Sequence, residues 1–492
     1  MIGRTITAHL NGLESSLVRV EAENLRGFSA FYIVGLAGPS ILEARIRIRA
    51  AMQACGMPLP PGKIVVNLYP ADERKTGTQW DLPIAIALAA CQGLVSPKRL
   101  EGAAFIGELG LDGSLRSVPG CLQMVMGLKE DIQTVYVPAD QARSCACLKS
   151  PLIYPVHHLK DLLAHLRGDP TLQPVRYEEK MAAEEAEEEG EAVDFSEMVG
   201  QQLLKKAMVL AATGQHSLLL IGPPGVGKSM ALHRFSGILP PLSGQLLREV
   251  MGIRSIMGAE EKGMRSHKRP LIAPHYSITR AGLVGGGNPI TPGACTSAHG
   301  GVLVLDELPL FSTACLDALR LILDQKKVTL SRAHKCRTYP AHFLLAAAMN
   351  PCPCGFDGDP RHECTCSSRE ILAYRRRIPQ MLLDRFDLIL EVTETELRKA
   401  GPPPLSSQEM RAQVVKGQQF LKENSGHFVM TGPAENLLQT LSRHYALSSR
   451  SQKSLQALGQ SLAALEEQTE IQADHLAEAF QYRRGRFTYW AR

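Results

Sequence analysis

The spacing of apolar residues changes along the chain, and the change divides it into regions. Before about residue 166, apolar strand-like runs alternate with helical patterns. The runs at 30–36, 63–70 and 134–139 are rich in β-branched and aromatic residues, whereas 40–55 and 81–94 have helical spacing. This alternation predicts an α/β domain over residues 1–170.

A second alternating region follows. Four short apolar runs, at 217–221, 301–305, 342–349 and 386–392, are separated by helical patterns. Continuous apolar strands between helices are typical of a parallel α/β sheet, which we place at 194–395. From about Gly432 the pattern is helical only, so residues 396–492 are predicted to form a helical lid.

The two regions are joined by a segment rich in Glu and Ala. Residues 177–195 read YEEKMAAEEAEEEGEAVDF and offer no apolar face that could be buried. We predict an exposed acidic linker at 171–193, a solvated charge run without a binding role.

Composition narrows the class of protein. With 492 residues, 45% hydrophobic and 21% charged, the chain is expected to fold into two to four soluble domains. No apolar run is long enough for a membrane helix, and the first residues do not resemble a secretion signal. Twelve cysteines in such a chain predict reduced thiols and a cytoplasmic location. The net charge of +5 permits nucleic-acid binding but does not by itself indicate it.

The segment GPPGVGKS, residues 222–229, predicts a phosphate-binding loop. It matches G-x-x-x-x-G-K-[ST], follows an apolar strand and precedes a helix, which is the context the motif requires. Its backbone N–H groups would surround the phosphates, Lys228 would reach the β- and γ-phosphates, and Ser229 would bind Mg²⁺. The predicted nucleotide-binding residues are Gly222, Pro223, Pro224, Gly225, Val226, Gly227, Lys228, Ser229 and Asp306.

Polar residues follow the next strands. Asp306 and Glu307 end one apolar run, where Asp306 would hold Mg²⁺ and Glu307 would act as general base on the attacking water. Asn350 ends the next run and could orient the same water. Arg385 in LLDRFD has two interpretations, a surface salt bridge or a phosphate-facing arginine supplied to a neighbouring subunit.

Four cysteines crowd the stretch NPCPCGFDGDPRHECTC, residues 350–366. Cys352, Cys354, Cys364 and Cys366 form two C-x-C pairs, a tighter spacing than most zinc sites, and His362 could replace one of them. We expect structural Zn²⁺ here. Free thiols in a loop and a redox switch are the alternatives.

These motifs together resemble the magnesium-chelatase-like AAA+ ATPases. The resemblance covers essentially the whole chain and includes DFSEMVGQQLLKKAMVLAATGQHSLLLIGPPGVGKS, APHYS, LVGGG and TPGACTSAHGGVLVLDELP. It implies that 222–229 is Walker A, Asp306 and Glu307 are Walker B, and Asn350 is sensor 1. It further implies that Arg385 is the arginine finger of the helix-2-insert clade and that Arg450 is sensor 2.

The branch of this family that the chain most resembles implies a hexameric, ATP- and Mg²⁺-dependent DNA helicase. Such rings drive branch migration of recombining DNA, as in natural transformation, so the implied partners are single-stranded and branched DNA and further copies of the chain. A metal-chelatase-like motor that remodels a protein partner remains the alternative.

The resemblance also implies two loops that face DNA. One lies within 258–287 and carries Lys262, Arg265, Lys268, Arg269 and Arg280. The other, residues 324–343, is predicted to be a β-hairpin and carries Lys326, Lys327, Arg332, Lys335 and Arg337. Such groups suit sequence-independent phosphate contacts, although solvated positive loops without a ligand are the plainer interpretation.

The first region resembles the Lon-protease fold, an α/β unit like the second domain of ribosomal protein S5. Ile84 stands where Lon-type enzymes carry the nucleophilic serine, and Gln123 or Met124 stands where the lysine is expected. A Ser–Lys dyad needs both groups, so we predict a proteolytically inactive domain that binds DNA or stacks rings. Arg45, Arg47 and Arg49 alternate along one helix and are interpreted equally well as a solvated face.

Overall fold

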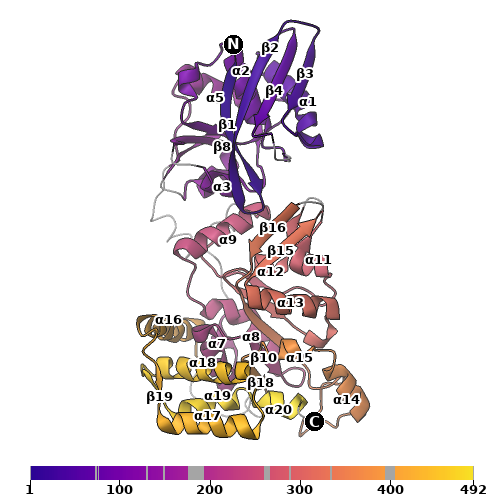
Figure 1. The fold of residues 1–492 in the computed structure, drawn as a ribbon, viewed down its shortest axis with the longest axis vertical. Coiled ribbons are helices and arrows are strands. Elements are labelled where there is room, and N and C mark those ends of the chain that lie inside the picture. Colours follow the sequence, from indigo (N-terminus) through magenta and orange to yellow (C-terminus); the bar gives the residue numbers. More distant parts are fainter. Residues whose placement is uncertain are drawn as a thin grey trace. The chain divides into compact units, whose positions relative to one another are not determined.

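The computed structural model divides the chain into two compact units. The first comprises Met1–Glu187 and Leu247–Ser266, and the second comprises Glu188–Leu246 and His267–Arg492 (Figure 1). The structure describes residues 2–71, 75, 77–128, 131–147, 150–175, 193–259, 266–287, 290–332, 335–393 and 405–490. Most of the predicted acidic linker, 176–192, lies outside these residues.

A seven-stranded sheet with the strand order β3-β4-β2-β1-β5-β8-β9 forms the centre of the first unit. Its strands are β1 (Gly3–Asn11), β2 (Glu14–Leu25), β3 (Ala30–Val34), β4 (Lys63–Tyr69), β5 (Ala103–Phe105), β8 (Thr134–Pro138) and β9 (Leu152–Val156), and a separate ribbon pairs β6 (Glu108–Leu109) with β7 (Leu115–Arg116). The helices are α1 (Pro39–Ala54), α2 (Asp81–Cys91), α3 (Cys121–Met126), α4 (Ala139–Cys145) and α5 (Leu159–Arg167). The strands and helices predicted for this region are confirmed.

Helix α2 is the centre of the first unit's core. Every residue of it from Asp81 to Ala90 is buried, which explains why its sequence is apolar all round rather than on one stripe. The first unit also continues past residue 170. Leu172 packs on the core, and Val175 forms a β-bridge with Ile153, so the linker begins later than predicted.

Part of the second half of the chain belongs to the first unit. Helix α9 (Gly244–Ile256) places Met251 in the same apolar cluster as residues of α3. The N–H of Gly120 donates to the carbonyl of Ser255 at 2.9 Å, and Gly252 approaches the Gln123 side chain so closely that a Cβ would lie 2.0 Å from its amide oxygen. The sequence pattern did not indicate this association.

The second unit contains the predicted parallel sheet, in the order β11-β14-β17-β10-β18. Its strands are β10 (Leu218–Ile221), β11 (Leu271–Ile272), β14 (Val302–Leu305), β17 (Leu344–Met349) and β18 (Leu388–Glu391). Alternate residues of each strand enter two different apolar clusters, as Leu218 and Leu220 do on one face and Leu219 and Ile221 on the other. Because both faces are buried, these strands read as continuous apolar runs.

Helices cover both faces of this sheet. One cluster joins the sheet to α7 (Gln202–Gly214), α8 (Lys228–Arg234) and the lid, and the other joins it to α13 (Thr313–Gln325) and α15 (Gln380–Leu383). Shorter elements are α11 (Arg280–Val284), α12 (Ala294–Ser297), α14 (Ser368–Arg375), β12 (Gly285–Gly286) and β13 (Thr291–Pro292). The expected hairpin is present as β15 (Lys327–Arg332) and β16 (Lys335–Pro340), paired antiparallel.

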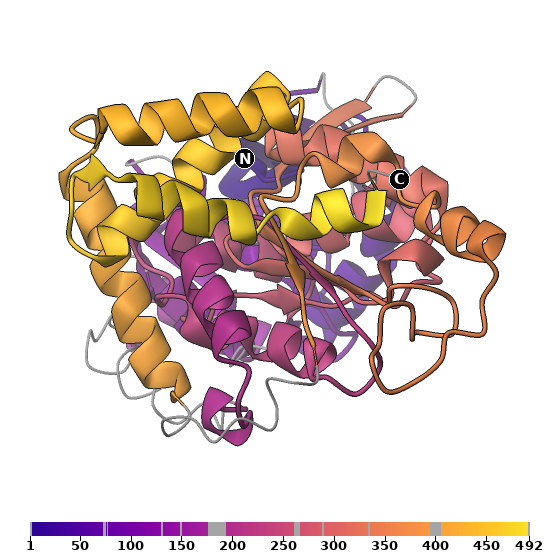
Figure 2. The same ribbon diagram turned by 90° about the horizontal axis from the view of Figure 1, so that it is seen from below.

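The C-terminal region is helical, as predicted. It consists of α16 (Ser407–Glu423), α17 (Gly432–His444), α18 (Ser449–Leu465), α19 (Ala473–Gln481) and α20 (Arg484–Trp490), with β19 (Val429–Met430) and β20 (Glu470–Ile471) paired between them. Helices α16 and α18 pack against α7, and the C-terminal helices form the orange-to-yellow end of the chain (Figure 2). Within the part of the chain that the structure describes, no helix has the length and apolarity needed to span a bilayer.

Close approach of α16 to α7 attaches the lid. A Cβ added at Gly417 would lie 2.7 Å from Cγ2 of Thr213 and 3.0 Å from Leu465, whereas a Cβ at Gly432 would meet nothing within 4 Å. We expect Gly417→Val to lower the free energy of unfolding by about 1–3 kcal/mol through overpacking. Gly432→Val is the matched control. Equal urea midpoints for the two variants, followed by circular dichroism, would contradict this packing role.

Candidate nucleotide site and four-cysteine cluster

The parallel sheet brings the predicted phosphate-binding groups to one edge. Strand β17 pairs with β10, where Ile221 faces Met349, and with β14, where Leu305 faces Ala347. The next residues of the three strands are therefore Gly222, Asn350 and Asp306, and they meet at the carboxyl edge, where α/β sheets bind ligands.

Lys228 is the first residue of α8, and its side chain links the P-loop to the end of strand β17. Its ammonium donates to the carbonyls of Gly222 and Pro223, both at 2.8 Å, and to Oδ1 of Asn350 at 3.2 Å. Gly227 at the N-cap has φ +91, a left-handed conformation that suits glycine. Lys228 is buried, and burial lowers the pKa of its ammonium to about 8, although the charge of Asp306 acts in the opposite direction.

The two acidic residues differ in environment. Oδ1 of Asp306 accepts a hydrogen bond from the N–H of Glu307 at 2.9 Å. Glu307 is exposed and has φ +54, a left-handed conformation that is unusual for a residue with a side chain. Ser229 is exposed in the first turn of α8. Asp306 and Ser229 thus offer the oxygen ligands that Mg²⁺ prefers, close in the fold to Lys228.

Arg385 and Arg450 share one partner. The Arg385 guanidinium donates to both carboxylate oxygens of Asp324, at 3.1 and 2.5 Å, and Arg450 donates to Oδ1 of the same residue at 3.3 Å. These hydrogen bonds, that of Arg385 above all, lower the pKa of Asp324. Arg385 belongs to the core and Arg450 to lid helix α18, so Asp324 joins the two arginines that sequence analysis treated separately.

Sequence reasoning missed Asp324 and also Tyr374. Burial raises the pKa of the Tyr374 phenol to about 12, and the charge of Glu307 raises it further, whereas a hydrogen bond to the backbone of Asn350 lowers it. Neither residue belongs to a motif. Asp324 could have been found only from its position at the end of an amphipathic helix that leads into a basic hairpin.

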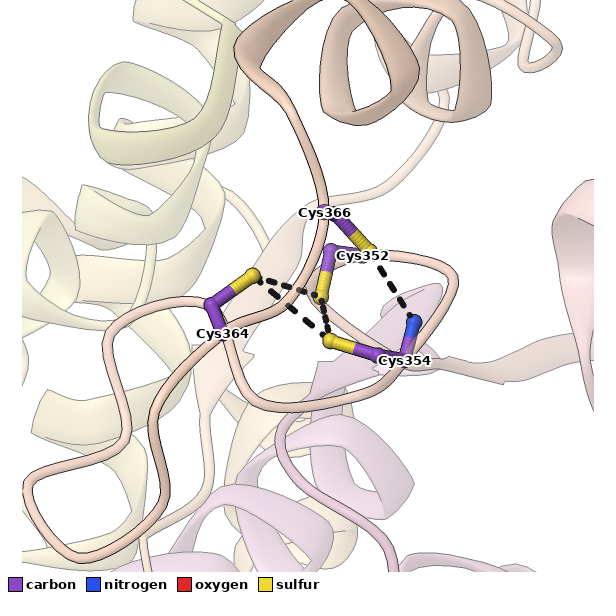
Figure 3. Close-up of side chains that lie close together, drawn as sticks. All are labelled: Cys352, Cys354, Cys364 and Cys366. Atoms are coloured by element: carbon purple, nitrogen blue, oxygen red, sulfur yellow. Dashed lines mark hydrogen bonds between the residues drawn. The ribbon is translucent and has the colours of Figure 1, made fainter.

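The four cysteines come together as predicted (Figure 3). The Sγ atoms of Cys352, Cys354, Cys364 and Cys366 all lie within 4.8 Å of one another. The distances from Cys352 to Cys354 and Cys364 are 3.3 and 3.7 Å, and Cys354 lies 3.6 Å from Cys364. Four thiolates around one tetrahedral Zn²⁺ would be about 3.8 Å apart, so the four-cysteine cluster fits this ion.

Backbone N–H groups donate to two sulfur atoms of the four-cysteine cluster, and the pKa values of its thiols diverge: that of Cys354 is lowered, whereas those of Cys364 and Cys366 are raised, in part by the neighbouring thiols. The N–H of Asp357 donates to Sγ of Cys352 at 3.3 Å, and the N–H of Cys354 donates to Sγ of Cys366 at 3.4 Å. A hydrogen bond from the backbone at Phe356 is the main cause of a lowered pKa of Cys354, about 5. His362 does not join the four sulfur atoms, and its Nδ1 lies 3.4 Å from Oδ2 of Asp359.

The basic residues proposed for DNA contact lie in different surroundings. Lys326 and Lys327 are exposed at the base of the β15–β16 hairpin. Arg337 is half-buried and donates to the carbonyl of Ile290 at 3.1 Å. Lys262 and Arg265 lie outside the described residues, and the structure describes only the backbone of Arg332 and Lys335.

Arg269 has a structural role instead. Its guanidinium donates to the carbonyls of Pro240 at 2.7 Å and Gly300 at 2.8 Å, and burial lowers its pKa. These bonds hold three loop segments together and occupy the Arg269 guanidinium with protein carbonyls.

In the first unit, the residues at the expected protease positions are buried. Ile84 is fully buried in α2, and Met124 lies in the apolar cluster around α3. Arg47 does not belong to a solvated face, because it donates to both oxygens of the buried Asp81 at 2.6 and 3.0 Å. Burial nevertheless raises the pKa of Asp81 to about 6.

Comparison with known proteins agrees with this arrangement. The family described as magnesium chelatase, subunit ChlI, matches residues 194–400, its C-terminal region matches 405–483, and a family described as subunit ChlI of Mg-chelatase matches 20–141. A parallel sheet with a P-loop, acidic and Asn strand tips and a helical C-terminal domain thus defines an AAA+ protein of the magnesium-chelatase type.

Relatives that match over their full length identify the branch of the magnesium-chelatase-like family to which the chain belongs. YifB of Salmonella typhimurium is 33% identical over 488 residues, and YifB of Escherichia coli is 34% identical over the same length, each covering 96% of this chain and 95% of the relative. Competence protein ComM of Haemophilus influenzae is 32% identical over 489 residues with the same coverage. The chain belongs to the ComM/YifB family of magnesium-chelatase-like AAA+ proteins.

The lowered pKa of Lys228 predicts a pH-dependent nucleotide affinity. Bound phosphates stabilise the charged lysine and raise its pKa above the free value of about 8. Between the two pKa values, binding requires proton uptake, so the Kd for Mg-ATP should increase up to about tenfold per pH unit above pH 8. Fluorescent-nucleotide titrations from pH 7 to 9.5 measure this slope. Lys228→Arg, which stays charged, should show a flat profile, and the same slope in this variant would contradict the assignment.

Proposed function

We propose that this protein is an ATP-driven, ring-forming DNA translocase that promotes branch migration of recombining DNA, as in natural transformation. The observation that carries the proposal is the meeting of the P-loop, Asp306 and Asn350 at one sheet edge in a chain related over its full length to a competence protein. In this proposal, Lys228 binds the β- and γ-phosphates, Ser229 and Asp306 hold Mg²⁺, and Glu307 activates the attacking water.

In this proposal, Arg385 and Arg450 act between neighbouring subunits of a hexamer. Arg385 would stabilise charge on the γ-phosphate of a neighbouring subunit, and Arg450 would act beside it. Their common bond to Asp324 supports a joint role, because whatever releases one arginine alters the other. Asn350 would orient the water once a nucleotide displaces its bond to Lys228.

DNA contact is proposed for the β15–β16 hairpin. Lys326 and Lys327 are exposed at its base, and the paired strands carry Arg332, Lys335 and Arg337. Cations on a rigid two-stranded ribbon suit binding to a phosphate backbone without base recognition. Lys262 and Arg265 remain candidates from the sequence alone.

Zinc is the ion proposed for the four-cysteine cluster, because four sulfur ligands at tetrahedral spacing suit Zn²⁺ better than Mg²⁺ or Ca²⁺. For the first unit we propose a Lon-like fold without protease activity, since Ile84 supplies no nucleophile. The family match to a magnesium-chelatase subunit supports one rival function, remodelling of a protein partner.

ATP hydrolysis with no DNA, single-stranded DNA and a four-way junction distinguishes the two functions. We expect junction DNA to stimulate hydrolysis and strand exchange, and Lys228→Ala to abolish both. Lys327→Ala should weaken DNA binding and reduce the slope of log K against log salt concentration by about 1, the value for one phosphate contact. Lys422 is an exposed lysine on α16, and Lys422→Ala should change neither. Strong hydrolysis that is indifferent to every DNA would overturn the proposal in favour of a protein-remodelling motor.

Metal content tests the zinc assignment. Purified protein never exposed to chelator should contain about one zinc ion per chain by atomic emission. Cys364→Ser should lower this content, and Cys336→Ser, which removes an exposed cysteine outside the cluster, should not. Zinc-free wild-type protein would refute the assignment.

A further inference from the structure

The loop that carries the four-cysteine cluster lies against the P-loop. We call residues 351–366 the cysteine loop. Gly355 in this loop has φ +91, and a Cβ added to it would lie 2.8 Å from Cδ of Pro224 and 3.4 Å from its Cγ. Pro224 is the third residue of Walker A. Glycine is therefore required at this position both by backbone conformation and by contact with the P-loop.

The two loops also share a pocket. A cavity of about 160 Å³ is bounded on one side by Gly222 and Pro223 and on another by residues of the cysteine loop. The strand end at 391–393 and Tyr489 complete its wall. The cysteine loop and the P-loop thus face the same cavity, beside the direct approach of Gly355 to Pro224.

A second connection runs through Asn350. This residue lies two positions before Cys352, and its Oδ1 accepts a hydrogen bond from Lys228 at 3.2 Å. Cys352 is buried within the four-cysteine cluster. The position of Asn350, and with it the partner of the phosphate-binding lysine, therefore depends on how the first cysteine is held.

Arg375 anchors the cysteine loop to the rest of the second unit. This buried guanidinium donates to the carbonyl of Pro351 at 3.0 Å, pairs with Asp357, and lies 4.6 Å from the ring centre of Tyr489. Tyr489 in turn donates to Glu391 at the end of β18, at 2.8 Å. The cysteine loop is thus anchored by Arg375 and also approaches the P-loop at Gly355.

Between these contacts the cysteine loop has little apolar material to hold its shape. Cys352 is buried, but most residues from 353 to 366 are exposed or half-buried. A loop of this composition takes its stability from cross-links rather than from burial. A metal bound by the four cysteines would supply them.

We infer that the four-cysteine cluster is a positioning centre for the nucleotide site, so that metal bound there holds the P-loop and Asn350 in the geometry that binds ATP. This inference rests on the proposed zinc and nucleotide sites but does not depend on DNA. The cysteines act through Pro224 and Asn350 and touch no part of the nucleotide. Loss of the metal should therefore weaken ATP binding even though Lys228, Ser229 and Asp306 are intact.

The test measures zinc content and the Kd of a fluorescent ATP analogue on the full-length chain without DNA. The double variant Cys364→Ser, Cys366→Ser should lose zinc and bind nucleotide at least about tenfold more weakly, equivalent to about 1.4 kcal/mol. Cys336→Ser should match wild type in both. Wild type stripped by chelator should weaken to the same degree and recover on addition of Zn²⁺, whereas the double variant should not recover.

Gly355→Ala distinguishes loss of zinc from loss of the contact between the cysteine loop and the P-loop. Its Cβ would press on Pro224, so this variant should keep zinc and still bind nucleotide more weakly. Zinc-free protein that keeps native circular dichroism and wild-type affinity would overturn the inference, as would Gly355→Ala with full zinc and unchanged Kd. Either result leaves DNA-stimulated hydrolysis, and hence the proposed function, untouched. Wild type that binds no nucleotide would instead refute the proposed function and the inference together.

Discussion

Parallel pairing of β17 between β10 and β14 is the constraint on which the candidate site depends. Because parallel strands end at one edge, the pairing of Ile221 with Met349 makes Gly222 and Asn350 neighbours although 128 positions separate them in the chain. Lys228 then spans from the P-loop to Asn350. The register cannot slip by one residue without exchanging the strand side chains between two fully buried faces.

The helical lid is attached to this sheet by a polar network rather than by packing alone. Asp387, which precedes β18, accepts hydrogen bonds from Ser454 at 2.5 Å and from the N–H of Ser217 at 3.3 Å, and Arg483 donates to its carbonyl at 3.2 Å. Although burial alone would raise the pKa of Asp387, its partners, His216 first among them, lower it. Asp387 therefore stays charged and fixes lid helices to the strand that adjoins the P-loop.

Sequence patterns predicted the parts of this protein whose cause is local. Strand and helix periods located the sheets, the hairpin and α2, and the P-loop spacing identified Lys228, because each depends on residues close in sequence. The same holds for the four cysteines, whose two pairs lie on one loop. Contacts made by tertiary packing had no such signal. Asp324 beneath Arg385, Gly355 against Pro224, and Met251 in the first unit's core depend on distant residues meeting.

Asp324 gives the arginine pair a mechanical connection to the basic hairpin. It lies in the last turn of α13, two residues before Lys326, where the chain takes φ +54 and β15 begins. The carboxylate that holds Arg385 and Arg450 therefore lies only a few residues from the start of the hairpin. If Arg385 and Arg450 turned toward a γ-phosphate as proposed, Asp324 would lose the hydrogen bonds that lower its pKa. A single carboxylate thus links the groups expected to sense nucleotide with those expected to hold DNA.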